Sequence, residues 1–206
     1  QPDLLALCTH GFGGMRDLLY GSIAQQVLQH GRWPVLVVKP GHASPAPDDA
    51  VQRIVVPIDG TQRHPAPMEM ASQLACALKA ELHLIMVVPT RETLAGDRSV
   101  VRRTMPSTVT AILELDEQDA VRYLREAAAG CTSYGVQPVA HVLRGDAVEE
   151  VVRYAQQVRA TLVIVATHGR AGIGAFFAGS FGAGIMDKIT TPILLVPRHP
   201  ETATDR

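Results

Sequence analysis

The sequence is poor in charged and aromatic residues and contains no long apolar run. Of its 206 residues, 19% are charged and 4% are aromatic, and 19 Lys and Arg residues stand against 20 Asp and Glu residues. Without a basic excess or a basic run, the chain lacks the positive face that nucleic-acid binding requires. No apolar stretch approaches the roughly 18–20 residues that span a bilayer. The sequence therefore predicts neither a nucleic-acid partner nor a membrane partner.

Cysteine is also scarce. Cys8, Cys76 and Cys131 are widely spaced and form no CxxC pair. An odd number of such cysteines argues against a disulfide framework or a zinc knuckle and favours a reducing compartment, so we expect a cytoplasmic protein. Cys76 and Cys131 fall in apolar helical patterns, where buried thiols are expected. The eight histidines show no metal-ligand spacing, and no metal site is expected.

The chain repeats itself. The segment Leu4-Leu-Ala-Leu-Cys-Thr-His-Gly11 resembles Leu162-Val-Ile-Val-Ala-Thr-His-Gly169, at an offset of 158 residues. The same offset aligns Gly21-Ser22 with Gly179-Ser180. About ten of the aligned positions between residues 4–38 and residues 162–196 are identical. Both copies read as a strand, a Gly-rich loop, a helix and a second strand.

Short apolar runs bounded by Gly or Pro predict strands that are buried on both faces. Between them, helical patterns cover Met68–Leu78, Gln118–Ala129 and Val148–Val158, the last one behind Asp146 as N-cap. This alternation predicts an α/β fold, a parallel sheet with helices on both faces. The expected strands are Leu4–Cys8, Val35–Val38, Ile54–Ile58, Leu82–Val88, Val139–Leu143, Leu162–Ala166 and Ile193–Val196.

The repeat also divides the chain. Residues 52–198 form a complete domain, and residues 1–40 hold only the last two strands and the last helix of another copy. Residues 41–51 are rich in Pro and Gly and read as a linker, and residues 199–206 as a tail. We expect the chain to be a fragment of a tandem protein of roughly 310 residues. The alternative is that residues 1–40 pack on the second domain as a reduced accessory.

One connection is unusually long. Pro89–Glu114 contains Arg91, Arg98, Arg102 and Arg103 and no clear strand or helix pattern. We expect it to be mobile or partly helical, a solvated basic loop rather than a set of phosphate ligands.

Five motifs in order resemble the universal stress protein family. They are Ile54-Val-Val-Pro-Ile-Asp-Gly60, Ala80-Glu-Leu-His-Leu-Ile-Met-Val-Val88, Gly145-Asp146-Ala147, Thr167-His-Gly169 with Gly179-Ser180, and Pro192-Ile-Leu-Leu-Val196. The resemblance covers the domain of residues 52–198 in full and residues 1–40 as part of a second copy. It implies a five-stranded parallel sheet of order 3-2-1-4-5, with a crevice between the first and fourth strands.

Nucleotide-binding members of this family carry Gly-x2-Gly-x9-Gly-[Ser/Thr] after the fourth strand. Here the second copy reads Ala166-x2-Gly169-x9-Gly179-Ser180, and the first copy has Cys8 at the first position. Glycines let backbone N–H groups approach phosphate oxygens, and the Gly-Ser opens a helix whose N-terminus favours anions. Both copies therefore keep three of the four positions and lose the first glycine.

The resemblance assigns roles by position. Asp59 would bind the ribose hydroxyls, and Ile58 and Val87 would contact the adenine. Gly169, Gly179 and Ser180 would hold the phosphates of ATP, with or without Mg²⁺. His168, Ala166 and Phe181 complete the expected site. All lie at or after carboxyl ends of strands, where open α/β sheets bind ligands.

Simpler interpretations stay open beside these roles. Asp59-Gly60 also fits a turn and helix cap, and the glycine loop could persist without a ligand. Gly174-Ala-Phe-Phe-Ala-Gly179-Ser180 has Walker spacing but Ser180 in place of the lysine, and Ser180 lies too far from its strand for a nucleophile elbow. No catalytic residues are assigned, and any ATP hydrolysis would be slow.

The expected function is an ATP-binding regulator of the stress response, with an unknown regulatory partner. The alternative is a family member that binds no nucleotide and acts through its dimer surface. The resemblance further implies antiparallel pairing of Val35–Val38 with Ile193–Val196, or of either strand with its mate in a homodimer, because such pairing removes exposed edges.

Overall fold

The computed structural model describes residues 3–8, 33–39, 53–60, 66–93, 106–167 and 180–197. All seven expected strands are present in these ranges. The expected linker 41–51 and tail 199–206 lie outside them, as do His168, Gly169 and Gly179. In chain order the elements are β1 (Leu5–Cys8), β2 (Val35–Val38), β3 (Arg53–Ile58), α2 (Ala66–Leu78), β4 (Glu81–Val88), α4 (Pro106–Cys131), η1 (Thr132–Tyr134), β5 (Val139–Arg144), α5 (Ala147–Gln157), β6 (Leu162–Thr167), α7 (Ser180–Lys188) and β7 (Ile193–Pro197).

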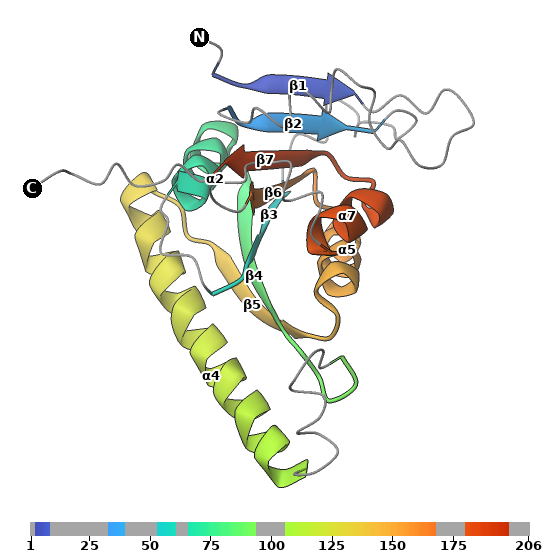
Figure 1. Ribbon diagram of the computed structural model, residues 1–206. Helices are drawn as coiled ribbons and strands as arrows, with labels where there is room; N and C mark the ends of the chain where they lie inside the picture. The colour runs from blue at the N-terminus through green and yellow to red at the C-terminus, as the bar shows by residue number, and fades with distance from the viewer. Residues whose placement is uncertain are drawn as a thin grey trace, which may run out of the picture.

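The strands form one sheet in the order β1-β2-β7-β6-β3-β4-β5 (Figure 1). This corrects the expected five-stranded parallel sheet, because the sheet has seven strands and is mixed. The five strands from β3 to β7 run parallel. From the β5 edge, their order across the sheet is β5, β4, β3, β6 and β7, which is the order 3-2-1-4-5 when these five strands are counted along the chain. The two added strands come from residues 1–40, with β2 antiparallel to β7 and parallel to β1.

Helices cover both faces of the parallel part of the sheet. α5 and α7 lie on one face, and α2 and α4 lie on the other (Figure 1). The first face buries Val55, Ile85 and Val163 against α5 and α7. The second buries Ile54, Leu84 and Ile164 against α2 and α4. Burial on both faces explains why these strands are continuous apolar runs in the sequence.

α4 is longer than its sequence pattern predicts. The pattern indicated a helix over Gln118–Ala129, whereas α4 begins at Pro106 and ends at Cys131. The last part of the expected connection Pro89–Glu114, from Pro106 onward, is therefore helical, which confirms the expectation of a partly helical segment. A proline fits the first turn of a helix, because the N–H that it lacks would have no partner there. None of the described helices combines the length and the apolar character needed to cross a membrane.

The cysteine prediction holds for one thiol and fails for another. Cys131 is buried and has a raised pKa because burial disfavours the thiolate. Cys76 is exposed on α2, and Cys8 is exposed on β1. Its neighbour Ala75 is buried, whereas Cys76 and Ala77 lie on the exposed side of α2. The expectation that it belongs to the core was wrong.

The predicted N-cap of α5 is confirmed. The carboxylate of Asp146 accepts hydrogen bonds from the backbone N–H groups of Val148, at 3.0 Å, and Glu149, at 3.1 Å. These bonds satisfy two N–H groups that have no partner within the helix.

We predict that Asp146→Ala lowers the free energy of unfolding by about 1 kcal/mol, because both N–H groups lose their acceptor. Asp146→Asn should stay close to the wild type, since asparagine is an equally good N-cap. Urea denaturation followed by circular dichroism measures both variants. An Asp146→Ala protein as stable as Asp146→Asn would contradict the capping role.

Candidate functional site

The carboxyl ends of β3 and β6 meet at one point of the sheet edge. These strands are neighbours, although β4 and β5 follow β3 in the chain before β6 is reached. The strand order thus reverses at the β3–β6 pair, and such switch points are where open α/β sheets bind ligands. Ile58 ends β3, and Ala166 is the penultimate residue of β6.

Ile58 and Ala166 line the same small cavity. Its volume is about 20 Å³, enough for one water molecule. α2 and α4 close it from one side with Met68 and Tyr123. The full lining is Val56, Pro57, Ile58, Pro67, Met68, Tyr123, Ala127 and Ala166. Among the described residues, this wall is apolar apart from Tyr123 and includes no charged side chain.

Asp59 and Gly60 directly follow Ile58 in the chain. Asp59 is exposed. Gly60 has a φ of +69°, a left-handed backbone conformation that favours glycine, and a Cβ there would also displace the terminal methyl group of Met86. The turn interpretation of Asp59-Gly60 is therefore correct for Gly60, and it places the Asp59 carboxylate on the surface beside the switch point.

The other predicted site residues are less closely grouped. Val87 is half-buried and packs with the cluster on the α5–α7 face, whereas Ile58 belongs to the opposite face. Phe181, in the first turn of α7, packs with the same cluster as Val87. Ser180 is the first residue of α7. His168, Gly169 and Gly179 lie outside the described residues.

A larger cavity that sequence reasoning missed opens at the ends of β4 and β5. Its volume is about 350 Å³, and its floor includes Val88 and Leu113. Arg144 pairs with Glu117 at its rim, and Arg91 donates a hydrogen bond to Thr110. The full lining is Val88, Pro89, Thr90, Arg91, Glu92, Thr110, Leu113, Glu114, Glu117 and Arg144. The first turns of α4 form one wall of this cavity, and no local sequence pattern predicted that the helix begins so early.

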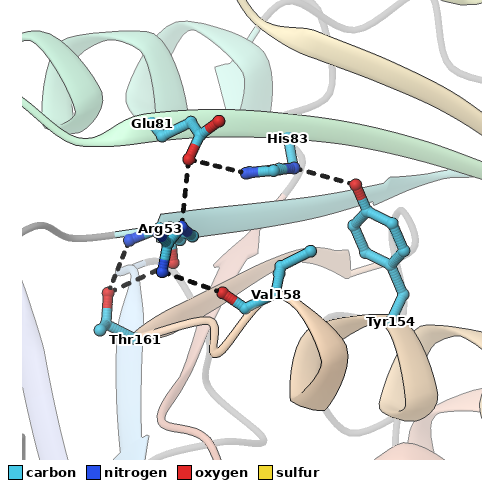
Figure 2. Close-up of polar contacts among 6 residues, drawn as sticks. All are labelled: Arg53, Glu81, His83, Tyr154, Val158 and Thr161. Carbon is cyan, nitrogen blue, oxygen red and sulfur yellow. Dashed lines mark hydrogen bonds and ion pairs between the residues drawn. The ribbon is translucent and has the colours of Figure 1, made fainter.

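A polar network lies at the other end of the strands (Figure 2). Arg53, the first residue of β3, donates to Oε2 of Glu81 at 3.1 Å and to the carbonyl of Val158 at 3.2 Å. Thr161 bonds with the backbone of Arg53. The network thus ties the end of α5 to the first residues of β3 and β4.

The buried member of this network is His83. Its Nδ1 lies 2.9 Å from the hydroxyl of Tyr154, and its Nε2 lies 3.5 Å from Oε2 of Glu81. Because a carboxylate only accepts, this arrangement favours a proton on Nε2 and an Nδ1 that accepts from Tyr154. His141 packs its ring on Tyr154 from β5. Nε2 is buried and makes no hydrogen bond.

Burial lowers the pKa of His83, an effect that Glu81 opposes and that His141 and Arg53 reinforce. The folded protein therefore holds this ring neutral at a pH where an unfolded chain would protonate it. For Glu81, partial burial acts to raise the pKa, but the hydrogen bond with Arg53 and the close electrostatic contact with His83 lower it overall. No sequence pattern predicts this contact, since His83 and Tyr154 are 71 residues apart.

Comparisons with known proteins agree with this architecture. The sequence profile of the universal stress protein family matches residues 1–39 and 50–197. A universal stress protein of Methanocaldococcus jannaschii is 22% identical over 151 residues, which are 73% of this chain and 85% of that protein.

Two solved structures share the fold. A universal stress protein from Archaeoglobus fulgidus superposes with a TM-score of 0.61 at 18% identity, over 97% of this chain and 62% of its own. This chain thus spans less than two thirds of that relative's length. Another universal stress protein from Archaeoglobus fulgidus, solved in complex with dAMP, has a TM-score of 0.50 at 15% identity, over 70% of this chain and 96% of its own.

We predict that acid destabilises the protein through His83. The unfolded chain binds the extra proton near pH 6.5, and the folded chain binds it only at a lower pH. The free energy of unfolding should therefore be highest above pH 6.5 and decline as the pH falls below it. The total loss is about 1.4 kcal/mol for each unit by which the pKa of His83 differs between the unfolded and the folded chain. Urea denaturation between pH 7.5 and 5.5 measures this decline.

His83→Gln should remove most of the decline. Tyr154→Phe is the matched control: it should cost about 1 kcal/mol at pH 7.5 through the lost hydrogen bond but keep the decline, because His83 stays buried. If His83→Gln and the wild type lose stability in parallel, the dependence arises elsewhere.

Proposed function

Because the chain belongs to the universal stress protein family, we propose that it is an adenine-nucleotide-binding regulator of the stress response that acts in the cytoplasm. The observation that carries the proposal is the shared cavity of Ile58 and Ala166 at the switch point between β3 and β6. The relative from Archaeoglobus fulgidus that was solved with dAMP supports an adenine nucleotide as the ligand class.

The proposed ligand is ATP, with or without Mg²⁺, lying over the mouth of the cavity. A volume of about 20 Å³ admits no base, so the adenine would rest against the ends of β3 and β4. Asp59, exposed directly after β3, would accept hydrogen bonds from the ribose hydroxyls. Gly169, Gly179 and Ser180 would hold the phosphates with backbone N–H groups at the start of α7.

Binding rather than turnover is the proposed role of this site. The described wall of the cavity contains no carboxylate, histidine, lysine or arginine that could act as acid or base. Nucleotide occupancy would then change how the protein meets a regulatory partner. Association of the chain with itself, as a homodimer or through the β2–β7 pairing within one chain, belongs to the same proposal.

A second candidate is a member of the family that binds no nucleotide and works as an interaction module. The observation that favours it is Ala166, whose methyl group lines the cavity at the position where nucleotide-binding relatives are expected to have glycine. The two candidates differ in whether this methyl group blocks the ligand.

We predict that Ala166→Gly raises the affinity for ATP about tenfold, which is about 1.4 kcal/mol, because the ligand can then approach the backbone of β6. Isothermal titration calorimetry gives the dissociation constant. Ala140→Gly, in β5 of the same sheet, is the matched control and should leave the affinity unchanged while costing similar stability. Equal affinity in all three proteins would mean that the methyl group is no obstacle.

We also predict that Asp59→Ala weakens ATP binding by about 1.5–3 kcal/mol, the usual worth of hydrogen bonds to a charged group. Dideoxy-ATP, which lacks both ribose hydroxyls, should bind the wild type and Asp59→Ala equally weakly. Asp119→Ala, on the exposed surface of α4, serves as the control. Unchanged ATP affinity in Asp59→Ala would remove this residue from the site, and absence of any ATP heat would favour the second candidate.

A further inference from the structure

The turn that follows β4 is fixed by hydrogen bonds of two threonines. The backbone N–H of Thr90 donates to Oγ1 of Thr93 at 2.8 Å, and the N–H of Thr93 donates to Oγ1 of Thr90 at 3.4 Å. Oγ1 of Thr93 donates in turn to the carbonyl of Gly145 at 3.2 Å, and the N–H of Gly145 donates to the carbonyl of Val88 at 3.0 Å. The two residues between these threonines line the cavity of about 350 Å³, so this wall of the cavity is held against the loop after β5.

The opposite wall is one face of α4. Its lining residues lie at positions i, i+3, i+4 and i+7 and therefore share one side of the helix: Thr110, Leu113, Glu114 and Glu117. Further along, the same side carries Ala120 and Leu124, which are buried. α4 extends beyond the end of the sheet (Figure 1), and there the inward side changes from apolar to polar. Polar side chains at these positions are typical of a wall that meets water or a polar ligand.

Two arginines join the walls of the cavity. Arg91 donates a hydrogen bond to the hydroxyl of Thr110 and so links the turn to α4. Arg144, the last residue of β5, pairs with the carboxylate of Glu117 and links β5 to α4. A guanidinium group has five N–H donors. The bond with Glu117 uses one N–H of the exposed Arg144, which leaves other donors of this group for an anion.

The lining combines both signs of charge with an apolar floor. Two arginines stand beside three glutamates. One of these, Glu114, lies between Thr110 and Glu117 on the helix face, and among the described residues no hydrogen bond or ion pair engages its carboxylate. Val88, Pro89 and Leu113 supply the apolar part. The cavity therefore offers a cationic group, an anionic group and an apolar surface to one ligand.

We propose that this cavity binds a free α-amino acid with an apolar side chain. Its carboxylate accepts hydrogen bonds from the guanidinium group of Arg144, and its ammonium group donates to the carboxylate of Glu114. Its side chain lies against Val88 and Leu113. At roughly 30 Å³ for each water molecule, the cavity has room for about twelve atoms other than hydrogen, which is the size of such an amino acid.

The charge pattern favours a zwitterion over a ligand with one sign of charge. An anion bound to Arg144 lies close to the carboxylates of Glu114 and Glu117, which repel it. A cation bound to Glu114 likewise meets the two guanidinium groups. A ligand with both charges pairs with each sign in the lining. The cavity shares no lining residue with the cavity of Ile58 and Ala166, so the proposal does not rest on nucleotide binding.

The test titrates the full chain, without nucleotide, by isothermal titration calorimetry. The probes are L-leucine, L-methionine and L-phenylalanine, of which at least one should bind with a stoichiometry of one. Each binding amino acid is then compared with the amine that lacks its carboxylate and with the acid that lacks its amino group. Both analogues should bind at least about tenfold more weakly, because each loses one charge-assisted hydrogen bond.

Two variants assign the two charges to their residues. Glu114→Gln should weaken binding of the amino acid at least about tenfold but bind the acid analogue at least as tightly as the wild type. Arg144→Gln should show the converse, with the amino acid weakened and the amine analogue retained. Glu126→Gln, at an exposed position of α4 outside the cavity, is the matched control and should bind like the wild type.

Three results would overturn the proposal. The first is the absence of binding heat with all three amino acids. The second is an analogue that binds as tightly as its amino acid, since a single charge would then suffice. The third is an amino acid that binds Glu114→Gln and Arg144→Gln as tightly as the wild type, because its site would then lie elsewhere on the chain.

Discussion

The antiparallel ladder between β2 and β7 is the interaction on which the rest of the sheet depends. Without it, β7 would be the edge of a parallel sheet, with a row of unpaired N–H and C=O groups beside an entirely buried apolar strand. β2 satisfies those groups and buries Val35 and Val37 in the same core as Ile193 and Leu195. Two segments far apart in the chain thereby share one hydrophobic core. Lys39, just after β2, adds a hydrogen bond to the carbonyl of Asp187 near the end of α7, where a cation is favourable.

α5 connects the polar network at one end of the strands with the site at the other. Its last turn is held by Arg53 through Val158, and its middle by His83 through Tyr154. On its other side α5 packs against α7, and a Cβ on Gly184 would lie only 3.0 Å from Cγ2 of Val148. A side chain at Gly184 would therefore press against Val148, so the glycine suits the close approach of the two helices. Since α7 begins at Ser180, the placement of the proposed phosphate site depends on α5, and through α5 on a buried histidine.

The sequence sufficed for features that depend on local pattern. All seven strands were predictable because strands buried on both faces are apolar runs, and Asp146 was predictable because capping involves residues three apart. Side-chain contacts between distant segments were not, although the family resemblance implied the antiparallel pairing of β2 with β7. His83 reads as one polar residue in an apolar strand, and only the fold brings Tyr154 to it. The start of α4 was missed because its first turns carry polar residues around the 350 Å³ cavity, which hides the apolar period. The strand order that the family resemblance implied already placed Ile58 and Ala166 side by side. Val87 lies on the other face of the sheet because side chains alternate between the faces along β4.

The two copies of the repeat differ in how they enclose the first position of the glycine motif, where neither copy has a glycine. Ala166 and Cys8 occupy equivalent positions in the two copies, and neither is glycine. In β6 the methyl group of Ala166 faces Met68 and Tyr123 and contributes to a cavity only as large as a water molecule. In β1 the side chain of Cys8 is exposed. The same position is therefore tightly enclosed in one copy and open in the other.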